Sequence, residues 1–212
     1  MRKEELRTYI ENHESEMIED LKSLIRIPSE KQVAEPGKPF GAPAAEALAQ
    51  GIGILEKYGF AVTNYDNYAI AADFNKEEKG LDILAHLDVV PAGEGWQETD
   101  PFTPLVKDGK MFGRGTADDK GPAIAAIYAM RAVKELGYPL KKNVRLVLGS
   151  DEECGSSDLE YYYKKEVEAP CTFSPDFRSS TLRKAACAAI SRKPPMPERQ
   201  VCASCPYRPA QN

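Results

Sequence analysis

The sequence has no apolar run long enough to cross a lipid bilayer, and its first residues, Met1 to Glu5, are mostly charged. A transmembrane helix needs about 20 predominantly apolar residues, and a secretory signal peptide needs an apolar core. Both features are missing. We therefore expect no membrane partner and predict a cytoplasmic location.

An excess of basic residues is also missing from most of the chain. The formal net charge is -5, yet residues 177–212 contain seven Lys or Arg and only one acidic residue, Glu198. That tail carries +6, so residues 1–176 carry -11. An acidic body lacks the basic surface that binds nucleic acid, and no nucleic-acid partner is expected.

The number of cysteines is odd. There are five, and three of them, Cys187, Cys202 and Cys205, lie in the tail. An odd number without a secretory start argues against a disulfide framework. Cys202 and Cys205 have the spacing of half a zinc knuckle, but no second ligand pair lies nearby, which favours chance spacing.

What the chain does have is the composition of an ordinary globular protein, with 212 residues of which 42% are hydrophobic. This length is enough for one domain with a substantial core. Apolar periodicity, Gly and Pro positions predict two helices and then a hairpin with its turn at Asp66-Asn67: helices over 3–27 and 44–58, strands over 61–64 and 68–74.

The middle of the chain alternates strands with helices. Residues 81–86 and 143–148 are short apolar runs typical of strands that are buried on both faces. Helical patterns cover 122–136 and 156–165, and a further apolar stretch covers 169–173. This order predicts an α/β sheet covered by helices, in which ligands bind beyond the carboxyl ends of the strands.

Acidic motifs stand where those strands and helices meet. They are His86-Leu87-Asp88, Asp118-Asp119-Lys120-Gly121 and Asp151-Glu152-Glu153, with Asp176 after the third apolar stretch. Each motif alone has an ordinary explanation as a structural histidine, a helix cap or a solvated turn. Together they supply one imidazole and several carboxylates at one edge of the sheet, which favours a site for divalent metal ions.

The motifs also resemble a known family, the two-zinc metallopeptidases that include aminoacylases, carnosinases and PepV-type dipeptidases. Besides the acidic motifs, the resemblance rests on the glycine-rich segment 113–121 and on Gly95-Trp96 followed by Asp100-Pro101-Phe102. It covers residues 1–176, and Asp118-Asp119-Lys120-Gly121-Pro122 is most similar to the PepV-type branch. The resemblance implies a three-layer α/β catalytic domain with helices on both faces of the sheet.

The resemblance also implies a role for each site residue. Two divalent metal ions, zinc by preference and manganese or cobalt as alternatives, would be bound by His86, Asp118, Glu153 and Asp176, with Asp118 bridging both ions. Asp88 would orient His86 from behind, and Glu152 would act as the general base. A cis peptide bond is implied between Asp118 and Asp119.

The resemblance stops after Asp176. The family has a later histidine ligand and a lid domain, whereas this sequence contains only His13 and His86. We therefore interpret residues 1–176 as the N-terminal part of an incomplete catalytic domain, with the lid missing. Codons that encode Phe177 to Lys184 can be chosen so that one restored nucleotide gives a family-like continuation, so we interpret residues 177–212 as an out-of-frame, poorly ordered tail. A natural short protein is the rival interpretation.

The sequence thus predicts a metal-dependent dipeptidase, in a form that is weakly active or inactive, with short peptides as substrate. Two alternatives stay open: an N-acyl amino-acid deacylase of the same family, and a fragment that binds metal without catalysis. The oligomeric state is not predicted.

Overall fold

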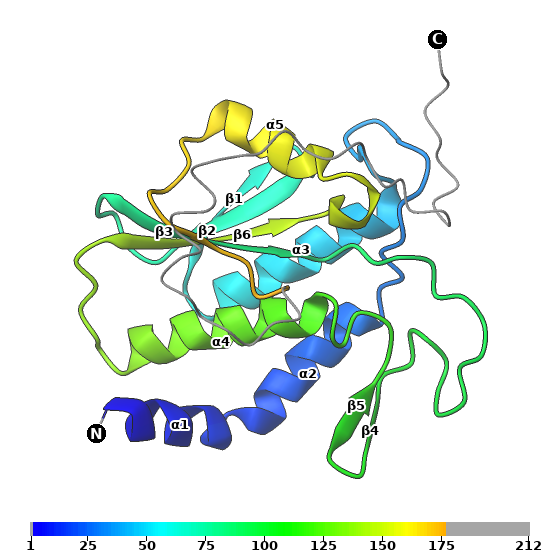
Figure 1. Ribbon diagram of the computed structural model, residues 1–212, viewed down its shortest axis with the longest axis horizontal. Helices are drawn as coiled ribbons and strands as arrows, with labels where there is room; N and C mark the ends of the chain where they lie inside the picture. Colours follow the sequence, from blue (N-terminus) through cyan, green and yellow to red (C-terminus); the bar gives the residue numbers. More distant parts are fainter. Residues whose placement is uncertain (1, 177–212) are drawn as a thin grey trace.

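A five-stranded mixed sheet forms the centre of the protein. The computed structural model describes residues 2–176. The strands lie in the order β1-β2-β6-β3-β7 (Figure 1), with the bounds β1 Ala61–Tyr65, β2 Ala69–Asp73, β3 Lys79–His86, β6 Asn143–Gly149 and β7 Thr172–Phe173. Strands β6, β3 and β7 are parallel to one another, and β1 and β2 are antiparallel additions.

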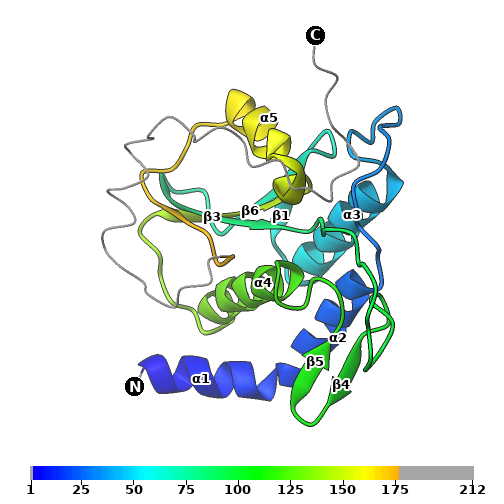
Figure 2. The ribbon, with the colours of Figure 1, turned by 45° about the vertical axis from the view of Figure 1, so that its right-hand side comes forward.

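Helices cover both faces of this sheet (Figures 1 and 2). Helix α5, Ser157–Lys165, packs on one face, and α3, Ala42–Lys57, and α4, Lys120–Glu135, pack on the other. Helices α1, Arg2–Asn12, and α2, Glu14–Ile25, form an outer layer against α3 and α4. The predicted α/β architecture with helices on both faces is confirmed.

The β1–β2 hairpin turns where the sequence predicted. Asp66 and Asn67 both have positive φ angles, 54° and 59°, as the central residues of a type I′ turn do, and Tyr68 donates its backbone N–H to the carbonyl of Tyr65 at 3.0 Å. The side chain of Asn64 accepts a hydrogen bond from the amide of Asn67, at 2.8 Å, and fixes the turn. This hairpin extends the sheet on the side away from β3 and β7.

The single helix predicted over residues 3–27 is wrong, because the chain breaks between α1 and α2. His13 donates its backbone N–H to the carbonyl of Ile10, 3.0 Å away, instead of to that of Tyr9. The Tyr9 carbonyl is bound by His13 Nδ1 at 2.7 Å, and the two rings stack with centroids 4.1 Å apart. The histidine side chain thus takes the place of one helical hydrogen bond, while the apolar periodicity continues on both sides.

Two short features complete the described chain. Strands β4, Leu105–Lys107, and β5, Lys110–Phe112, form a separate hairpin that the sequence interpretation did not include. The last predicted strand is shorter than expected, because only Thr172 and Phe173 pair with β3. Within residues 2–176 we find no helix with the length and apolar character needed to cross a membrane.

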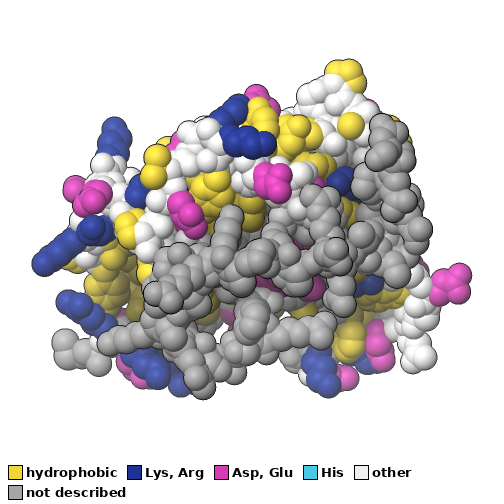
Figure 3. Space-filling view, turned by 45° about the horizontal axis from the view of Figure 1, so that its top comes forward, with side chains coloured by type: hydrophobic (Ala, Val, Ile, Leu, Met, Phe, Trp, Pro, Cys, Tyr) yellow, Lys and Arg dark blue, Asp and Glu magenta, His cyan; other side chains and the backbone are white. Residues whose placement is uncertain are grey.

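The face on the α5 side has mixed charge where described residues form it. Figure 3 shows lysine and arginine side chains next to aspartate and glutamate side chains, with apolar groups between them.

Candidate metal site

Parallel strand ends bring the acidic motifs to one edge of the sheet. In the β3–β6 ladder His86 lies opposite Gly149, so both strands end at the same level. The segment after β6 continues as a short 3₁₀ turn, Glu152–Cys154, and the segment after β7 reaches Asp176. The convergence predicted from the order of strands is therefore present, because parallel neighbours direct their carboxyl ends the same way.

The imidazole of His86 is at the centre of this convergence. Its Nε2 atom lies 3.3 Å from Asp118 Oδ1 and 3.8 Å from Glu152 Oε2. The histidine side chain is 3% exposed, whereas those of Asp118 and Glu152 are 55% and 44% exposed. Two groups have ligand atoms that all lie within 4.8 Å of one another: His86, Asp118 and Asp176, and His86, Glu152 and Glu153.

Asp88 fixes the orientation of the imidazole. His86 Nδ1 lies 3.1 Å from the backbone carbonyl of Asp88 and 3.2 Å from its carboxylate. In the neutral imidazole, an Nδ1–H that donates to these oxygens leaves the lone pair on Nε2. Nε2 is buried and has no hydrogen-bond partner within the described residues. A buried imidazole nitrogen that lacks a hydrogen-bond partner and faces carboxylates has the surroundings of a metal ligand.

The site has more negative charge than its own side chains offset. Burial, followed by the charge of Asp118, raises the pKa of Glu153 to about 7. Burial lowers the pKa of His86, but Asp88 and the surrounding carboxylates outweigh it and raise that pKa to about 10. Within residues 2–176, no Lys or Arg forms an ion pair with Asp118, Glu152 or Glu153. The donor set therefore fits a divalent cation, which would supply the missing positive charge.

The loop before α4 brings Asp118 to the site. The peptide bond between Asp118 and Asp119 is cis, as the resemblance implied. Asp119 is fully buried, and its carboxylate accepts a hydrogen bond from the backbone N–H of His86 at 3.0 Å. This bond ties the loop to the end of β3. Burial raises the pKa of Asp119 to about 7.

Lys120 ties the same loop to α2. Its buried ammonium group donates to the carbonyls of Leu24, at 2.9 Å, and Ile27, at 2.7 Å, at the C-terminal end of that helix. Burial lowers the pKa of Lys120 to about 7. Next to it, a Cβ on Gly121 would lie 2.0 Å from the carbonyl oxygen of Thr116, so only glycine fits there.

Asp151 is the one acidic residue of its motif that faces away from this cluster. Its carboxylate, 1% exposed, lies 2.6 Å from Lys31 Nζ and accepts a hydrogen bond from Ser157 Oγ. The sequence motif gave Asp151 no separate role, because the lysine that pairs with it lies 120 residues earlier. It anchors the turn that carries Glu152 and Glu153.

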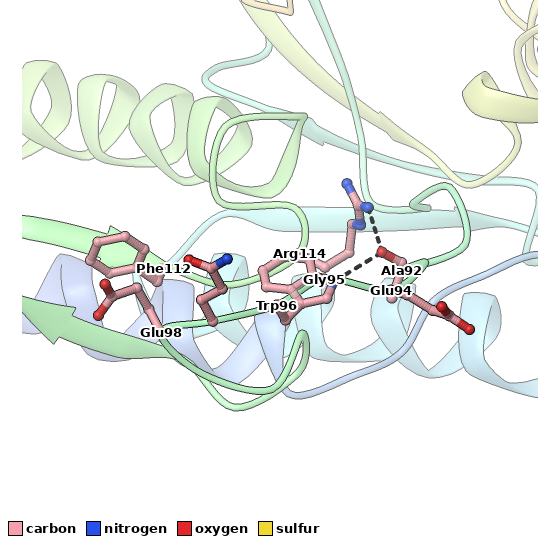
Figure 4. Close-up of a pocket in the computed structure, with 8 residues that line it drawn as sticks. Ala92, Glu94, Gly95, Trp96, Glu98, Phe112 and Arg114 are labelled. Carbon is pink, nitrogen blue, oxygen red and sulfur yellow. Dashed lines mark hydrogen bonds between the residues drawn. The ribbon is translucent and has the colours of Figure 1, made fainter.

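Apart from the acidic cluster, a hollow of about 390 Å³ lies beside Trp96 (Figure 4). The Ala92 carbonyl accepts hydrogen bonds from Trp96 Nε1, at 2.9 Å, and from the Arg114 guanidinium, at 3.0 Å. The guanidinium carbon lies 5.5 Å from the centre of the Trp96 ring. Two segments that carry the family resemblance, around residues 96 and 114, therefore pack on one another here.

Comparison with known proteins identifies the family. The family model described as peptidase family M20/M25/M40 matches residues 83–204, more than half of the chain. The chain belongs to this family. The M20 match extends past residue 176, and the domain boundary predicted there stays a prediction, since residues 177–212 lie outside the described residues.

The chain is also similar in sequence to individual dipeptidases. The chain is 38% identical over 163 residues to a putative dipeptidase, YtjP, of Bacillus subtilis, a match that covers 76% of the chain and 35% of the relative. It is 39% identical over 163 residues to the beta-Ala-Xaa dipeptidase of Lactobacillus delbrueckii, covering 76% of the chain and 34% of the relative. The chain thus spans about a third of the length of these M20 relatives.

A solved structure shows the same fold. The crystal structure of human carnosine dipeptidase 1 matches with a TM-score of 0.71 and 29% identity, over 82% of this chain and 41% of that one. The implied peptidase catalytic-domain architecture is therefore confirmed, and the chain corresponds to a part of the larger M20 structure.

Proposed function

We propose that this M20 chain carries most of the divalent-metal site of a dipeptidase. The observation that supports the proposal most strongly is the buried Nε2 atom of His86, which has no hydrogen-bond partner among residues 2–176 and faces the carboxylates of Asp118 and Glu152. Zinc suits an imidazole combined with carboxylates, and manganese and cobalt are the alternatives.

The residues would divide the work as the family resemblance implies. His86 and Asp176 would bind one ion, Glu153 the other, and Asp118 would bridge them. The first group of neighbouring ligand atoms, from His86, Asp118 and Asp176, supports the ligand set for the first ion, and the second group places Glu153 beside His86 and Glu152. Asp88 would keep the histidine in the tautomer that leaves Nε2 free.

Ions bound here would lower the pKa of a water molecule and polarise the peptide carbonyl. The Glu152 carboxylate would take the proton from that water and deliver it to the departing amine. Burial, with the surrounding negative charge, raises the pKa of Glu152 above its usual value. A raised pKa makes a carboxylate a better proton acceptor near neutral pH, which suits a general base.

The chain itself should hydrolyse dipeptides slowly or not at all. Its only other histidine, His13, lies at the α1–α2 junction with its ring stacked on Tyr9, away from the site. The second ion would therefore have carboxylates alone from this chain, without a neutral nitrogen ligand. The dipeptide substrate and the cytoplasmic location remain predictions.

The test is hydrolysis by the purified chain with Zn²⁺ or Mn²⁺, using a dipeptide, a β-alanyl dipeptide and N-acetyl amino acids. We expect slow cleavage of a dipeptide that falls about a hundred-fold in Glu152→Gln. Glu56→Gln, which changes an exposed glutamate on α3, is the matched control and should leave the rate unchanged.

Other outcomes separate the alternatives. Cleavage of the acylated amino acids alone would favour the deacylase. Metal binding without any cleavage would favour a non-catalytic fragment. Dipeptide cleavage that survives Glu152→Gln would contradict the role of this glutamate.

A further inference from the structure

The turn that carries Glu152 and Glu153 is held through its backbone by two buried carboxylates. Four successive amide groups, at residues 150–153, all donate to aspartate side chains. Asp158 Oδ2 accepts from the amides of Ser150 (2.6 Å) and Asp151 (2.9 Å), and Asp88 accepts from those of Glu152 (3.3 Å) and Glu153 (3.1 Å). The conformation of the turn therefore depends on side chains from outside it.

The two carboxylates come from different elements. Asp88 follows β3 and is 1% exposed, whereas Asp158 lies in the first turn of α5 and is fully buried. The segment after β6 is thus bound on one side by a residue that follows β3 and on the other by a residue of α5. Gly149 gives Asp158 the necessary room, because a Cβ at that position would lie 2.2 Å from Asp158 Oδ2.

Helix capping does not explain the burial of Asp158. An acidic residue in the first turn of a helix usually stabilises it from an exposed position. A buried carboxylate is costly unless hydrogen bonds satisfy it, and Asp158 receives three. Two come from the turn, and the third comes from the amide of Leu159, which donates to Oδ1 at 2.7 Å. Most of its bonds therefore serve the segment that leads to Glu152.

We propose that Asp158 is a positioning residue of the site: it holds the backbone at Ser150 and Asp151 so that Glu152 and Glu153 present their carboxylates beside His86. Asp158 itself would touch neither metal nor substrate. Its contribution to metal binding rests on the proposed function, whereas its hold on the turn is a property of the chain alone.

Because a carboxylate has two acceptor oxygens, replacing Asp158 with asparagine tests its hydrogen bonds with little change in shape. Three amide donors converge on the two oxygens of Asp158. An asparagine has one carbonyl oxygen and one NH₂ group, so Asp158→Asn must turn a donor either toward the turn or toward Leu159. The shape of the side chain is kept while at least one hydrogen bond is lost.

Asp82 offers a matched control. It is also fully buried, on β3, and its Oδ2 accepts from the amide of Ala169 at 3.1 Å and from Tyr163 Oη at 3.3 Å. Its Oδ1 has no hydrogen-bond partner within the described residues. Asp82→Asn can therefore keep its bonds, and it makes the same change in charge and shape without any bond to the turn.

The first measurement is amide hydrogen exchange, by NMR, in the metal-free chain. We expect Asp158→Asn to speed exchange of the Ser150 and Asp151 amides at least ten-fold, while Asp82→Asn leaves both within two-fold of the unaltered chain. Unchanged exchange in Asp158→Asn would overturn the proposal. If that variant does not fold, Gly149→Ala makes the same test, because its methyl group displaces the Asp158 carboxylate.

The second measurement is Zn²⁺ affinity, by competition with a chelator. Changes to residues that orient metal ligands typically weaken binding ten- to a hundred-fold. We expect a loss of at least ten-fold in Asp158→Asn and none in Asp82→Asn. Equal affinity in Asp158→Asn and the unaltered chain would overturn the proposed positioning. If the unaltered chain binds no Zn²⁺, the proposed metal site fails, and the exchange comparison alone decides whether Asp158 positions the turn.

Discussion

Two clusters of charged side chains in this protein differ in how their charges are balanced. Between α2, α3 and α4, the buried carboxylate of Asp20 accepts hydrogen bonds from Tyr58, from Tyr128 at 2.8 Å and from Lys57 at 3.1 Å. Arg131 in the same cluster lies 2.6 Å from Glu16. Every carboxylate named here has a donor from a neighbouring helix.

The metal-site cluster has the opposite balance. The carboxylates of Asp118, Glu152 and Glu153 lie around a single imidazole and have no Lys or Arg partner within the described residues. The pKa values follow this difference: a hydrogen bond from Arg131 lowers the pKa of Glu16 to about 2, whereas burial raises that of Glu153 to about 7. A cluster that stabilises the fold satisfies its own charges, and a cluster that binds a cation leaves them unsatisfied.

The largest effect is expected from breaking the balanced cluster. Asp20→Ala leaves Tyr58, Tyr128 and Lys57 without their shared acceptor, and removing one member of a buried polar network costs about 3 kcal/mol. Urea denaturation should show this loss of stability. Zn²⁺ affinity should stay unchanged, and a parallel loss of Zn²⁺ binding would show that the clusters are coupled.

Neutralising a carboxylate of the metal-site cluster should weaken Zn²⁺ binding and leave the stability of the fold almost unchanged. Asp118→Asn removes a carboxylate whose side chain is 55% exposed, so we expect the stability to change by less than about 0.5 kcal/mol. Zn²⁺ affinity should fall on the order of a hundred-fold if Asp118 is the direct ligand we propose, since such a ligand matters at least as much as the groups behind it. Calorimetric titration measures the affinity, with Glu56→Gln as the control. A large loss of stability would contradict the distinction.

The pH dependence of the metal-free chain should reveal the unsatisfied charge. The pKa of Glu153 rises on folding, from 4.5 to about 7, so folding takes up a proton between these values and stability falls as the pH rises through them. Glu153→Gln should remove this loss and stabilise the metal-free chain by about 1 kcal/mol at pH 8, after allowance for solvent screening. At pH 4 the two chains should unfold alike. If Glu153→Gln and the unaltered chain were equally stable at pH 8 as well as at pH 4, the raised pKa of Glu153 would be contradicted.

The smallest effect is expected at Lys57. Its side chain is 46% exposed, and its ion pairs with Asp20 and Glu16, both at 3.1 Å, are screened by solvent. Lys57→Ala should therefore destabilise the fold by only about 0.5 kcal/mol. A loss as large as that of Asp20→Ala, measured by the same denaturation, would mean that the ammonium group rather than the tyrosine hydroxyls balances Asp20.

Much of the site could be predicted because its residues follow parallel strands. Apolar runs before His86 and before Glu152 indicated buried neighbouring strands, and their common direction brings both ends to one edge. The β4–β5 hairpin was missed although Asp108-Gly109 is a strong hairpin signal, with φ angles of 51° and 70° at the turn. That error was avoidable from the sequence.

Other features depend on tertiary contacts and could not be predicted in this way. The break at His13 arises because its ring binds the Tyr9 carbonyl, a choice that apolar periodicity does not record. Asp158 has the sequence context of an ordinary acidic residue at a helix start. Only the packing of α5 over the end of β6 shows that its carboxylate holds the turn.

The most direct test of the account is thermal unfolding of the unaltered chain during a Zn²⁺ titration at pH 8, beside His86→Ala. A cation that binds only the folded state raises its stability with concentration. We predict a saturable rise in Tm for the unaltered chain and none for His86→Ala. No rise in the unaltered chain, or an equal rise in both, would contradict the claim that this acidic edge of the sheet is a metal site.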